Sequence, residues 1–200
     1  MGALRRLGLS GGMWLALLLA LVMIGCTDSP KVTLLTNEEY FNALIPYLTG
    51  AKQEIAVSMF LFSPGEQESN RANQVKAALI EAAKRGVQVH VFLDQSEGQD
   101  FSTEANRGVA KELRRRGIKV RLDSPARTTH TKLVVIDQRY VFLGSHNFTH
   151  SALRHNNEAS VLIDSPQMAK QVLSYVHRIE EESRHEQTST REGERPSVRR

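Results

Sequence analysis

The sequence predicts an α/β fold in which a mixed central sheet is flanked by helices, and three observations indicate it. Short apolar runs alternate with amphipathic segments, which gives the β-α-β-α-β rhythm of a parallel or mixed sheet with helices on both faces. Hydrophobic residues make up 40% of the 200, enough for one sizeable core. The sequence has no internal repeat. We therefore expect one domain, residues 27–184.

The strands are predicted from runs rich in apolar residues. The run at 55–62 is almost continuously apolar, which is typical of a buried strand. Residues 118–122 alternate apolar and basic side chains, which indicates a half-buried strand. The full set of expected strands is 31–36, 55–62, 87–93, 118–122, 131–136, 140–143 and 158–163.

The helices are predicted from apolar residues at helical spacing and from signals at their ends. Asn37 is expected to cap the first helix, which has Glu38 and Glu39 in its first turn. The later helices are expected at 70–85, before Gly86, at 103–116, before Gly117, and from the pair Ser165-Pro166 onward. Residues 185–200 are polar without periodic apolar positions, so we expect a disordered tail.

The most informative part of the sequence is the pattern HxKxxxxDxxxxxxGSxN, which begins at His130. An imidazole can attack phosphorus, so His130 is the candidate nucleophile. Lys132 lies two residues on and, on a strand, faces the same way, where it can neutralise phosphate oxygens. Ser145 and Asn147 repeat this spacing and offer a hydroxyl and an amide donor to the same oxygens. Gly144 lets the backbone come close. The pattern therefore predicts a phosphate site.

Two carboxylates are candidates for orienting His130, because the attacking nitrogen of a histidine is set by the bond that its other nitrogen makes. Asp137 follows the apolar run 133–136, so it is either a turn residue that ends a strand or a member of the catalytic site. Glu158 begins another apolar segment, and by itself it would be interpreted as a solvated charge at a strand end. The residues alone leave both alternatives open.

The stretch from His130 to Glu158 resembles the HKD motif of the phospholipase D superfamily, and the single copy in a short chain is similar to its bacterial endonuclease branch. The similarity extends over most of residues 31–180. It implies a phospholipase D-like α-β-α sandwich and a metal-independent phosphodiesterase that forms a phosphohistidine and needs no cofactor. The roles it implies are nucleophile for His130, phosphate binding for Lys132, Ser145 and Asn147, support of the histidine for Glu158, and a more structural part for Asp137.

The chain carries one copy of the motif, whereas the larger members of that superfamily carry two. One histidine attacks while the other protonates the leaving oxygen, as general acid catalysis requires. A homodimer with two-fold symmetry would bring His130 of each protomer to one site. The alternative, an inactive monomer, leaves the nucleophile without its acid.

Residues 1–26 are expected to be a signal peptide, because Arg5 and Arg6 precede an apolar stretch at 13–25. As a helix, 13 residues reach about 20 Å, less than the roughly 30 Å of a bilayer core. Cys26 directly follows this stretch, which resembles a lipobox and predicts acylation at Cys26. Met23 departs from the more usual leucine. We therefore expect an exported lipoprotein anchored to a membrane, with a secreted periplasmic or extracellular protein as the alternative.

Charge and the remaining histidines add less. Without Arg5 and Arg6 the chain carries 24 basic and 22 acidic residues, a mild bias. The basic residues between 111 and 127 form either a solvated helix face or a track for a phosphate backbone. They are Lys111, Arg114, Arg115, Arg116, Lys119, Arg121 and Arg127. A zinc site is disfavoured, since the histidines near the motif lack cysteines and helical HxxxH spacing. They are His146, His150 and His155.

Three functions of different classes fit these residues. The first is a nuclease that cleaves DNA or RNA. The second keeps the mechanism and acts on membrane phospholipids as a phospholipase D. The third is an inert module that binds nucleic acid or lipid, against which the intact set His130, Lys132, Ser145 and Asn147 argues, because binding alone does not need a nucleophile.

Overall fold

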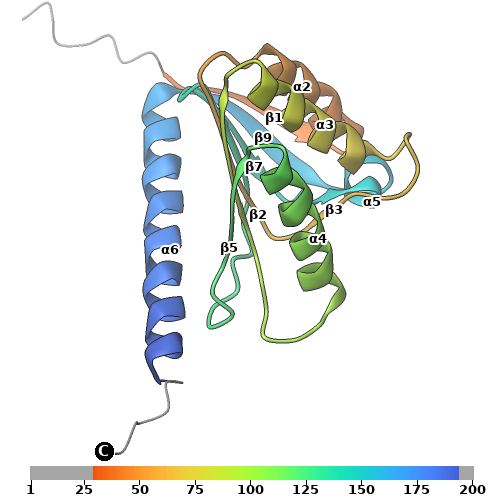
Figure 1. Cartoon of the computed structure of the whole chain (residues 1–200). Coiled ribbons are helices and arrows are strands. Elements are labelled where there is room, and N and C mark those ends of the chain that lie inside the picture. The colour runs from red at the N-terminus through yellow and green to blue at the C-terminus, as the bar shows by residue number, and fades with distance from the viewer. Residues whose placement is uncertain (1–28, 194–200) are drawn as a thin grey trace, which may run out of the picture.

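The computed structural model describes residues 29–193, with side chains up to residue 189. Seven strands in this part of the chain form one mixed sheet in the order β1-β9-β7-β6-β2-β4-β5 (Figure 1). They are β1 Lys31–Thr36, β2 Glu54–Met59, β4 Gln88–Leu93, β5 Lys119–Leu122, β6 Lys132–Ile136, β7 Tyr140–Gly144 and β9 Ala159–Asp164. The expected mixed sheet is therefore confirmed, with each predicted strand present within two or three residues of its expected ends.

A small second sheet escaped the sequence prediction. It pairs β3, Phe62–Ser63, with β8, Phe148–Thr149, in parallel. The rings of Phe62 and Phe148 meet edge to face at 5.1 Å between centroids and are fully buried. This contact fixes the segment that follows β2 against the segment that follows the GSxN part of the motif.

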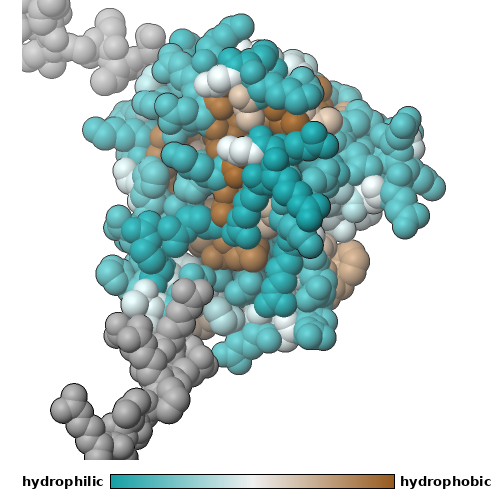
Figure 2. Space-filling model, in the orientation of Figure 1, coloured by the Kyte–Doolittle hydropathy of each residue, from teal (hydrophilic) through white to brown (hydrophobic). Residues whose placement is uncertain are grey.

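The helices lie on both faces of the large sheet (Figure 1). They are α2 Glu38–Gly50, α3 Arg71–Lys84, α4 Phe101–Arg115, α5 His150–Arg154 and α6 Pro166–Gly193. One face packs against α2, α3 and α4 in a large apolar core, and the other packs against α6 through a smaller one. Figure 2 shows hydrophilic residues over most of one side of the molecule, with a hydrophobic band between the two helical layers. The α-β-α arrangement is confirmed.

Local capping explains two of the helix starts and corrects a third. Asn70 accepts from the N–H groups of Ala72 and Asn73, and Asp100 caps α4 through the N–H of Thr103. Asn37 precedes α2 as predicted but makes no side-chain cap, so that part of the prediction is wrong. Its side-chain oxygen accepts instead from the backbone N–H of Glu158, at 2.9 Å, across the sheet edge.

The expected disorder after residue 184 is also wrong for residues 185–193, which continue α6. The helix persists because its later turns pack against the domain: Ser183 is buried, and the Gln187 amide donates to the carbonyls of Leu122 and Asp123 at 3.2 and 3.0 Å. The signal segment 1–26, with Cys26, and residues 194–200 lie outside the described residues. Within residues 29–193 the structure has no helix that is long and apolar enough to span a membrane.

Candidate active site

The candidate site lies at the edge of the sheet where β2 and β4 end and β6 begins. β2 is parallel to β4 and antiparallel to β6, so these three strand ends meet. Met59, the last residue of β2, pairs with Lys132, and Asp94, which follows β4, donates its N–H to the Met59 carbonyl at 3.2 Å. His130 precedes β6 and therefore lies on this edge.

His130 and Lys132 are in direct contact. The Lys132 Nζ lies 3.2 Å from Nε2 and 3.3 Å from Nδ1 of the imidazole, and it donates to the His130 carbonyl at 3.2 Å. Burial and the charge of Lys132 lower the pKa of His130, which favours the neutral, nucleophilic ring at neutral pH. Burial lowers the pKa of Lys132 as well, and the carboxylates of Glu158 and Asp94 oppose that shift. Charge and nucleophile are thus side by side.

Ser145 and Glu158 form the second half of the site. The Ser145 hydroxyl donates to a Glu158 carboxylate oxygen, and the other oxygen accepts from the Asn156 amide at 3.1 Å. Ser145 is also locked to the first residue of β9, since its N–H and its hydroxyl oxygen both bond to the backbone of Ala159. The electrostatic effect of Glu158 on Lys132 ties this half to the His130 half.

Gly144 makes the close approach of β7 and β9 possible. A Cβ at this position would overlap the Ser160 side chain and the Ala159 carbonyl of the neighbouring strand. The glycine of the motif therefore lets β7 and β9 lie close at the site, as its residue type predicts.

Asn147 reaches the site region with unused hydrogen-bonding capacity. Its side-chain oxygen is buried and has no hydrogen-bond partner among the described residues. Buried polar atoms are normally satisfied, so a free amide beside a candidate phosphate site is suited to a ligand. Rotation of the amide would present its N–H donors to the same position.

Asp137 and Glu158 were the two carboxylates expected to orient His130. In the described part of the chain, neither Glu158 nor Asp137 is hydrogen-bonded to His130, whose ring packs against Phe60 at 4.4 Å between centroids. The support of His130 by Glu158 therefore stays a prediction. Phe60, which also lies 4.9 Å from the Lys132 ammonium, was missed because nothing distinguishes it from the other residues of its apolar run.

Asp137 lies at the opposite end of β6 from Lys132. Its carboxylate accepts from the backbone N–H groups of Lys52, Gln53 and Glu54 at distances between 2.8 and 3.2 Å. Its own φ is +51°, a left-handed conformation that Asp tolerates better than most residues. These contacts favour the turn interpretation of Asp137, and its catalytic role stays a prediction.

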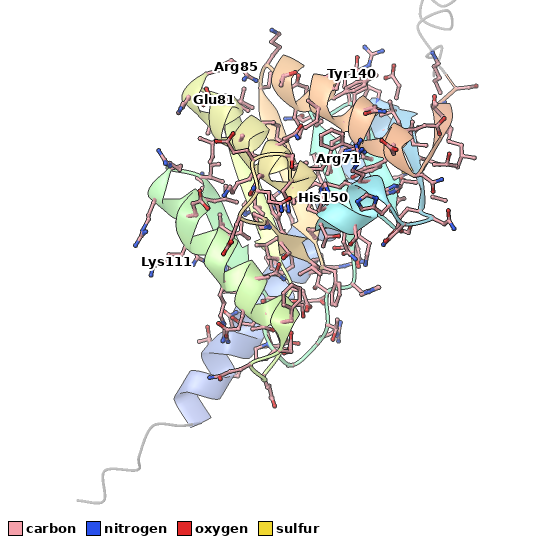
Figure 3. The ribbon with its side chains drawn as sticks, turned by 90° about the vertical axis from the view of Figure 1, so that its right-hand side faces the viewer. Arg71, Glu81, Arg85, Lys111, Tyr140 and His150 are labelled. Atoms are coloured by element: carbon pink, nitrogen blue, oxygen red, sulfur yellow. The ribbon has the colours of Figure 1, made fainter. Side chains whose placement is uncertain are left out.

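Two of the histidines near the motif are bound to other groups of the protein. His146 is fully buried and stacks on Tyr40 at 4.3 Å between centroids. Its Nδ1 lies 2.7 Å from the Ser160 hydroxyl, and its Nε2 lies 2.9 Å from the Asn37 carbonyl, so both ring nitrogens are engaged. His150 accepts the backbone N–H of Arg71 at 3.1 Å, and both residues are labelled in Figure 3.

The basic cluster is partly used by the fold. The Arg114 guanidinium donates twice to the Val120 carbonyl, at 3.0 and 2.9 Å, and Arg127 lies 3.4 Å from a Glu182 carboxylate oxygen. Lys111 extends from α4 to the surface (Figure 3). Arg114 and Arg127 are thus engaged within the fold, and the phosphate track stays a prediction.

A cavity of about 320 Å³ borders the site, between the segment that carries His130 and α6. Tyr175 and Arg178 of α6 contribute to its wall. Its volume is in the range of small-ligand sites. It gives room next to His130 for a group attached to a phosphate.

Comparison with known proteins places this geometry in a family. The model of the family described as "Cardiolipin synthase, PLD-like domain" matches residues 44–179, more than half of the chain. The chain belongs to the phospholipase D superfamily. This agrees with the resemblance of the HKD motif, whose His130, Lys132, Ser145 and Asn147 lie within the matched range.

Individual relatives agree with this assignment. A phospholipase D of Rickettsia bellii is 38% identical over 100 residues, which cover 50% of this chain and 47% of the relative. A cardiolipin synthase B of Shigella flexneri is 33% identical over 134 residues, 61% of this chain and 30% of the relative. The chain thus spans about half the length, or less, of these curated relatives. The crystal structure of Nuc from Salmonella typhimurium, a phospholipase D family member, aligns with a TM-score of 0.61 at 26% identity, covering 76% of this chain and 94% of Nuc.

Proposed function

We propose that the protein is a metal-independent phosphodiesterase in which His130 is the nucleophile. The observation that carries this proposal is the contact between Lys132 and both ring nitrogens of His130, at 3.2 and 3.3 Å, on the edge shared with Ser145 and Glu158. Nucleophile and cation reach one phosphate from this edge. The superfamily membership supports the same reaction type.

The reaction divides into two displacements. Attack by a His130 ring nitrogen forms a P–N bond while the P–O bond to the leaving group breaks, and a general acid protonates the leaving oxygen. Water then attacks phosphorus, its proton passes to the same group, and the P–N bond breaks. Lys132 neutralises the charge that develops on the non-bridging oxygens, with Ser145 and Asn147 as further donors.

Nucleic acid is the substrate that we propose, with endonucleolytic cleavage. The chain aligns with nearly all of the Nuc structure, whereas it matches less than half of the phospholipase D relative. The cavity beside His130 offers space for a nucleotide next to the scissile phosphate. Hydrolysis of a membrane phospholipid is the second candidate, favoured by the sequence identity to phospholipase D of Rickettsia bellii.

One experiment tests the reaction and the substrate together. Purified protein lacking residues 1–26 is incubated in EDTA with labelled DNA, labelled RNA, phosphatidylcholine vesicles and bis(4-nitrophenyl) phosphate, a diester without either neighbouring structure. Turnover of DNA or RNA and of the synthetic diester, abolished in His130→Ala, is the expected result. Turnover of phosphatidylcholine alone would mean that the protein is a phospholipase and not a nuclease. Wild-type rates in His130→Ala would exclude the covalent mechanism.

The general acid is proposed to be His130 of a second copy in a homodimer. The chain has one copy of the motif, so an acid in the partner completes the site. An exposed apolar strip on the α6 face of the sheet supports a second copy there: Leu34 pairs with Val161, which pairs with Leu143, the residue before Gly144. Leu34 and Leu143 are 63% and 39% exposed, so this strip leaves apolar surface that a second copy could cover.

Subunit mixing tests this arrangement. Wild-type protein is equilibrated with an excess of His130→Asn protomers, and the activity per wild-type protomer is measured. If two His130 side chains serve one phosphodiester, most wild-type protomers lose activity in heterodimers. Activity in simple proportion to the wild-type protomers would mean that each chain works alone.

Export and lipid anchoring are proposed from residues 1–26. The n-region, the apolar stretch and the Gly25-Cys26 junction support a membrane-anchored lipoprotein. Mass spectrometry of the native protein is expected to find acylated Cys26 as the first residue. An intact Met1, or cleavage beyond Cys26 without lipid, would exclude the anchor.

A further inference from the structure

The segment that carries His130 is irregular, yet it must hold a nucleophile in place. It connects β5 to β6 and is itself neither strand nor helix up to Lys132. The His130 side chain is exposed, so core packing does not fix it. The residue before it, Thr129, is 8% exposed and is the last buried residue ahead of the nucleophile.

Thr129 is held from two sides by buried carboxylates. Its backbone N–H donates to Asp94 Oδ1 at 2.6 Å, and its hydroxyl donates to a carboxylate oxygen of Asp123. Each aspartate is 4% exposed. Hydrogen bonds to a charged acceptor are short and strong, and a buried carboxylate that loses a donor is costly. The two bonds therefore fix both the backbone and the side chain of Thr129.

The backbones around the two aspartates are themselves anchored to the sheet and to helices on both of its faces. The Asp94 carbonyl accepts from the fully buried Asn106 amide of α4 at 2.9 Å. The Asp123 N–H donates to the Leu93 carbonyl at 2.9 Å, and the next N–H, of Ser124, donates to the Ser183 hydroxyl of α6 at 2.7 Å. Asp94 also acts on the charge of Lys132. We call Thr129, Asp94 and Asp123 with their two hydrogen bonds the clamp. The clamp connects the segment that carries His130 to parts of the chain that do not move independently of the core.

We propose that Thr129 is a positioning residue, which aligns the His130 imidazole for attack through its bonds to Asp94 and Asp123. This inference rests on the proposed function of His130. A misplacement of about 1 Å at a reacting group costs on the order of 100-fold in rate, so an anchor one residue away controls turnover. It controls substrate binding less, because Lys132 is held separately by β6.

The test compares three variants. Thr129→Val keeps the size of the side chain and the backbone N–H bond but removes the hydroxyl bond to Asp123. Thr129→Ser keeps the hydroxyl and serves as the conservative rescue. Thr49→Val makes the same change at an exposed position of α2, where the hydroxyl donates to the Ile45 carbonyl at 3.0 Å. Activity is measured on bis(4-nitrophenyl) phosphate, together with amide hydrogen exchange across residues 127–131 and thermal unfolding.

We expect Thr129→Val to lower kcat about 10- to 100-fold with KM within about twofold, while Thr129→Ser and Thr49→Val stay within about threefold of wild type. Faster exchange of the Thr129 and His130 amides in Thr129→Val, without global unfolding, is expected as well. Equal kcat in Thr129→Val and Thr49→Val would overturn the proposal.

A measurement on the wild-type protein keeps the two proposals separate. The Thr129 amide is expected to exchange much more slowly than the Thr128 amide, since its acceptor is a buried carboxylate. Equal exchange would overturn the clamp, even if Thr129→Val failed to fold. If wild-type protein hydrolysed no diester while the Thr129 amide was protected, the proposed function would fail and the clamp would stand as a structural element.

Discussion

The two ends of strand β6 carry polar residues of the same motif and use them in opposite ways. At the Lys132 end, side chains contact side chains: Lys132 lies against His130, and Ser145 bonds to Glu158. At the Asp137 end, one carboxylate binds three backbone N–H groups. Five residues of strand separate the two ends by roughly 16 Å. Strand β6 therefore has the candidate site at its Lys132 end and a turn at its Asp137 end.

This difference teaches how to distinguish a functional from a structural carboxylate. Backbone N–H groups are fixed by the fold, so the carboxylate of Asp137 keeps the same hydrogen-bond donors. Glu158 binds the side chains of Ser145 and Asn156, both at the surface, so a ligand can reach these hydrogen bonds. Spacing in the sequence does not distinguish a functional from a structural carboxylate. The hydrogen-bond donors that each carboxylate binds do distinguish them.

Among changes at the two ends of β6 itself, the largest effect is expected for Lys132→Ala. Loss of the cation that meets the developing phosphate charge should lower kcat/KM about 100- to 1000-fold, by analogy with the loss of an oxyanion donor. The variant Lys170→Ala, at an exposed position of α6, provides the matched control. Unchanged kcat in Lys132→Ala would mean that Lys132 takes no part in the reaction.

At the other end of β6, Asp137→Ala should reduce stability and leave catalysis alone. Three backbone N–H groups lose their acceptor, which we expect to cost about 2 kcal/mol of unfolding free energy. Asp137→Asn retains an acceptor oxygen and should cost less. Denaturant unfolding and steady-state kinetics check both effects, and a large loss of kcat in correctly folded Asp137→Asn would contradict the division of roles.

Glu158→Gln sharpens the comparison within the site. The amide keeps an oxygen that can accept from Ser145 but removes the negative charge beside Lys132. We expect kcat to fall about 10-fold, typical of a group that supports proton transfer, with an unchanged melting temperature. Glu81→Gln, at an exposed position of α3, should change neither quantity. A lower melting temperature with an unchanged kcat would mean that Glu158, like Asp137, has a structural role.

The smallest effect concerns the pKa of His130. Burial and the Lys132 charge lower it, so the ring should titrate below the usual value of about 6.5 and be neutral, and able to attack, at pH 7. Lys132→Met removes the charge and should raise this pKa. NMR titration of the His130 Cε1–H signal measures both. A midpoint that did not move in Lys132→Met would mean that the charge of Lys132 does not reach the ring.

Much of the fold was predictable because its strands and helices follow local patterns. Continuous apolar runs located β2 and β6, and Asn70 and Gly86 marked the ends of α3. Asn37 misled because its side chain bonds to Glu158, far away in sequence. The later turns of α6 look disordered in the sequence because they are polar, and their contacts with β5 are visible only in three dimensions.

The site was predictable where it follows the motif and not where it depends on the meeting of strand ends. Spacing identified His130, Lys132, Ser145 and the glycine before it. Asp94 follows a different strand and Thr129 has no distinctive neighbour in the sequence, so neither could be assigned a role. Asp137 shows the converse: it belongs to the motif by spacing but lies away from the site.

The pairing of β1 with β9 joins the first strand of the domain to the last. In a chain synthesised from its N-terminus, β1 has no partner in the sheet until β9 has been made, and closing so long a loop is costly in entropy. Ser145 is locked to Ala159, the first residue of β9, and Glu158 immediately precedes it. The final strand to emerge thus closes the sheet and completes the site in the same step, so a nascent or truncated chain that lacks it is without the activity that we propose.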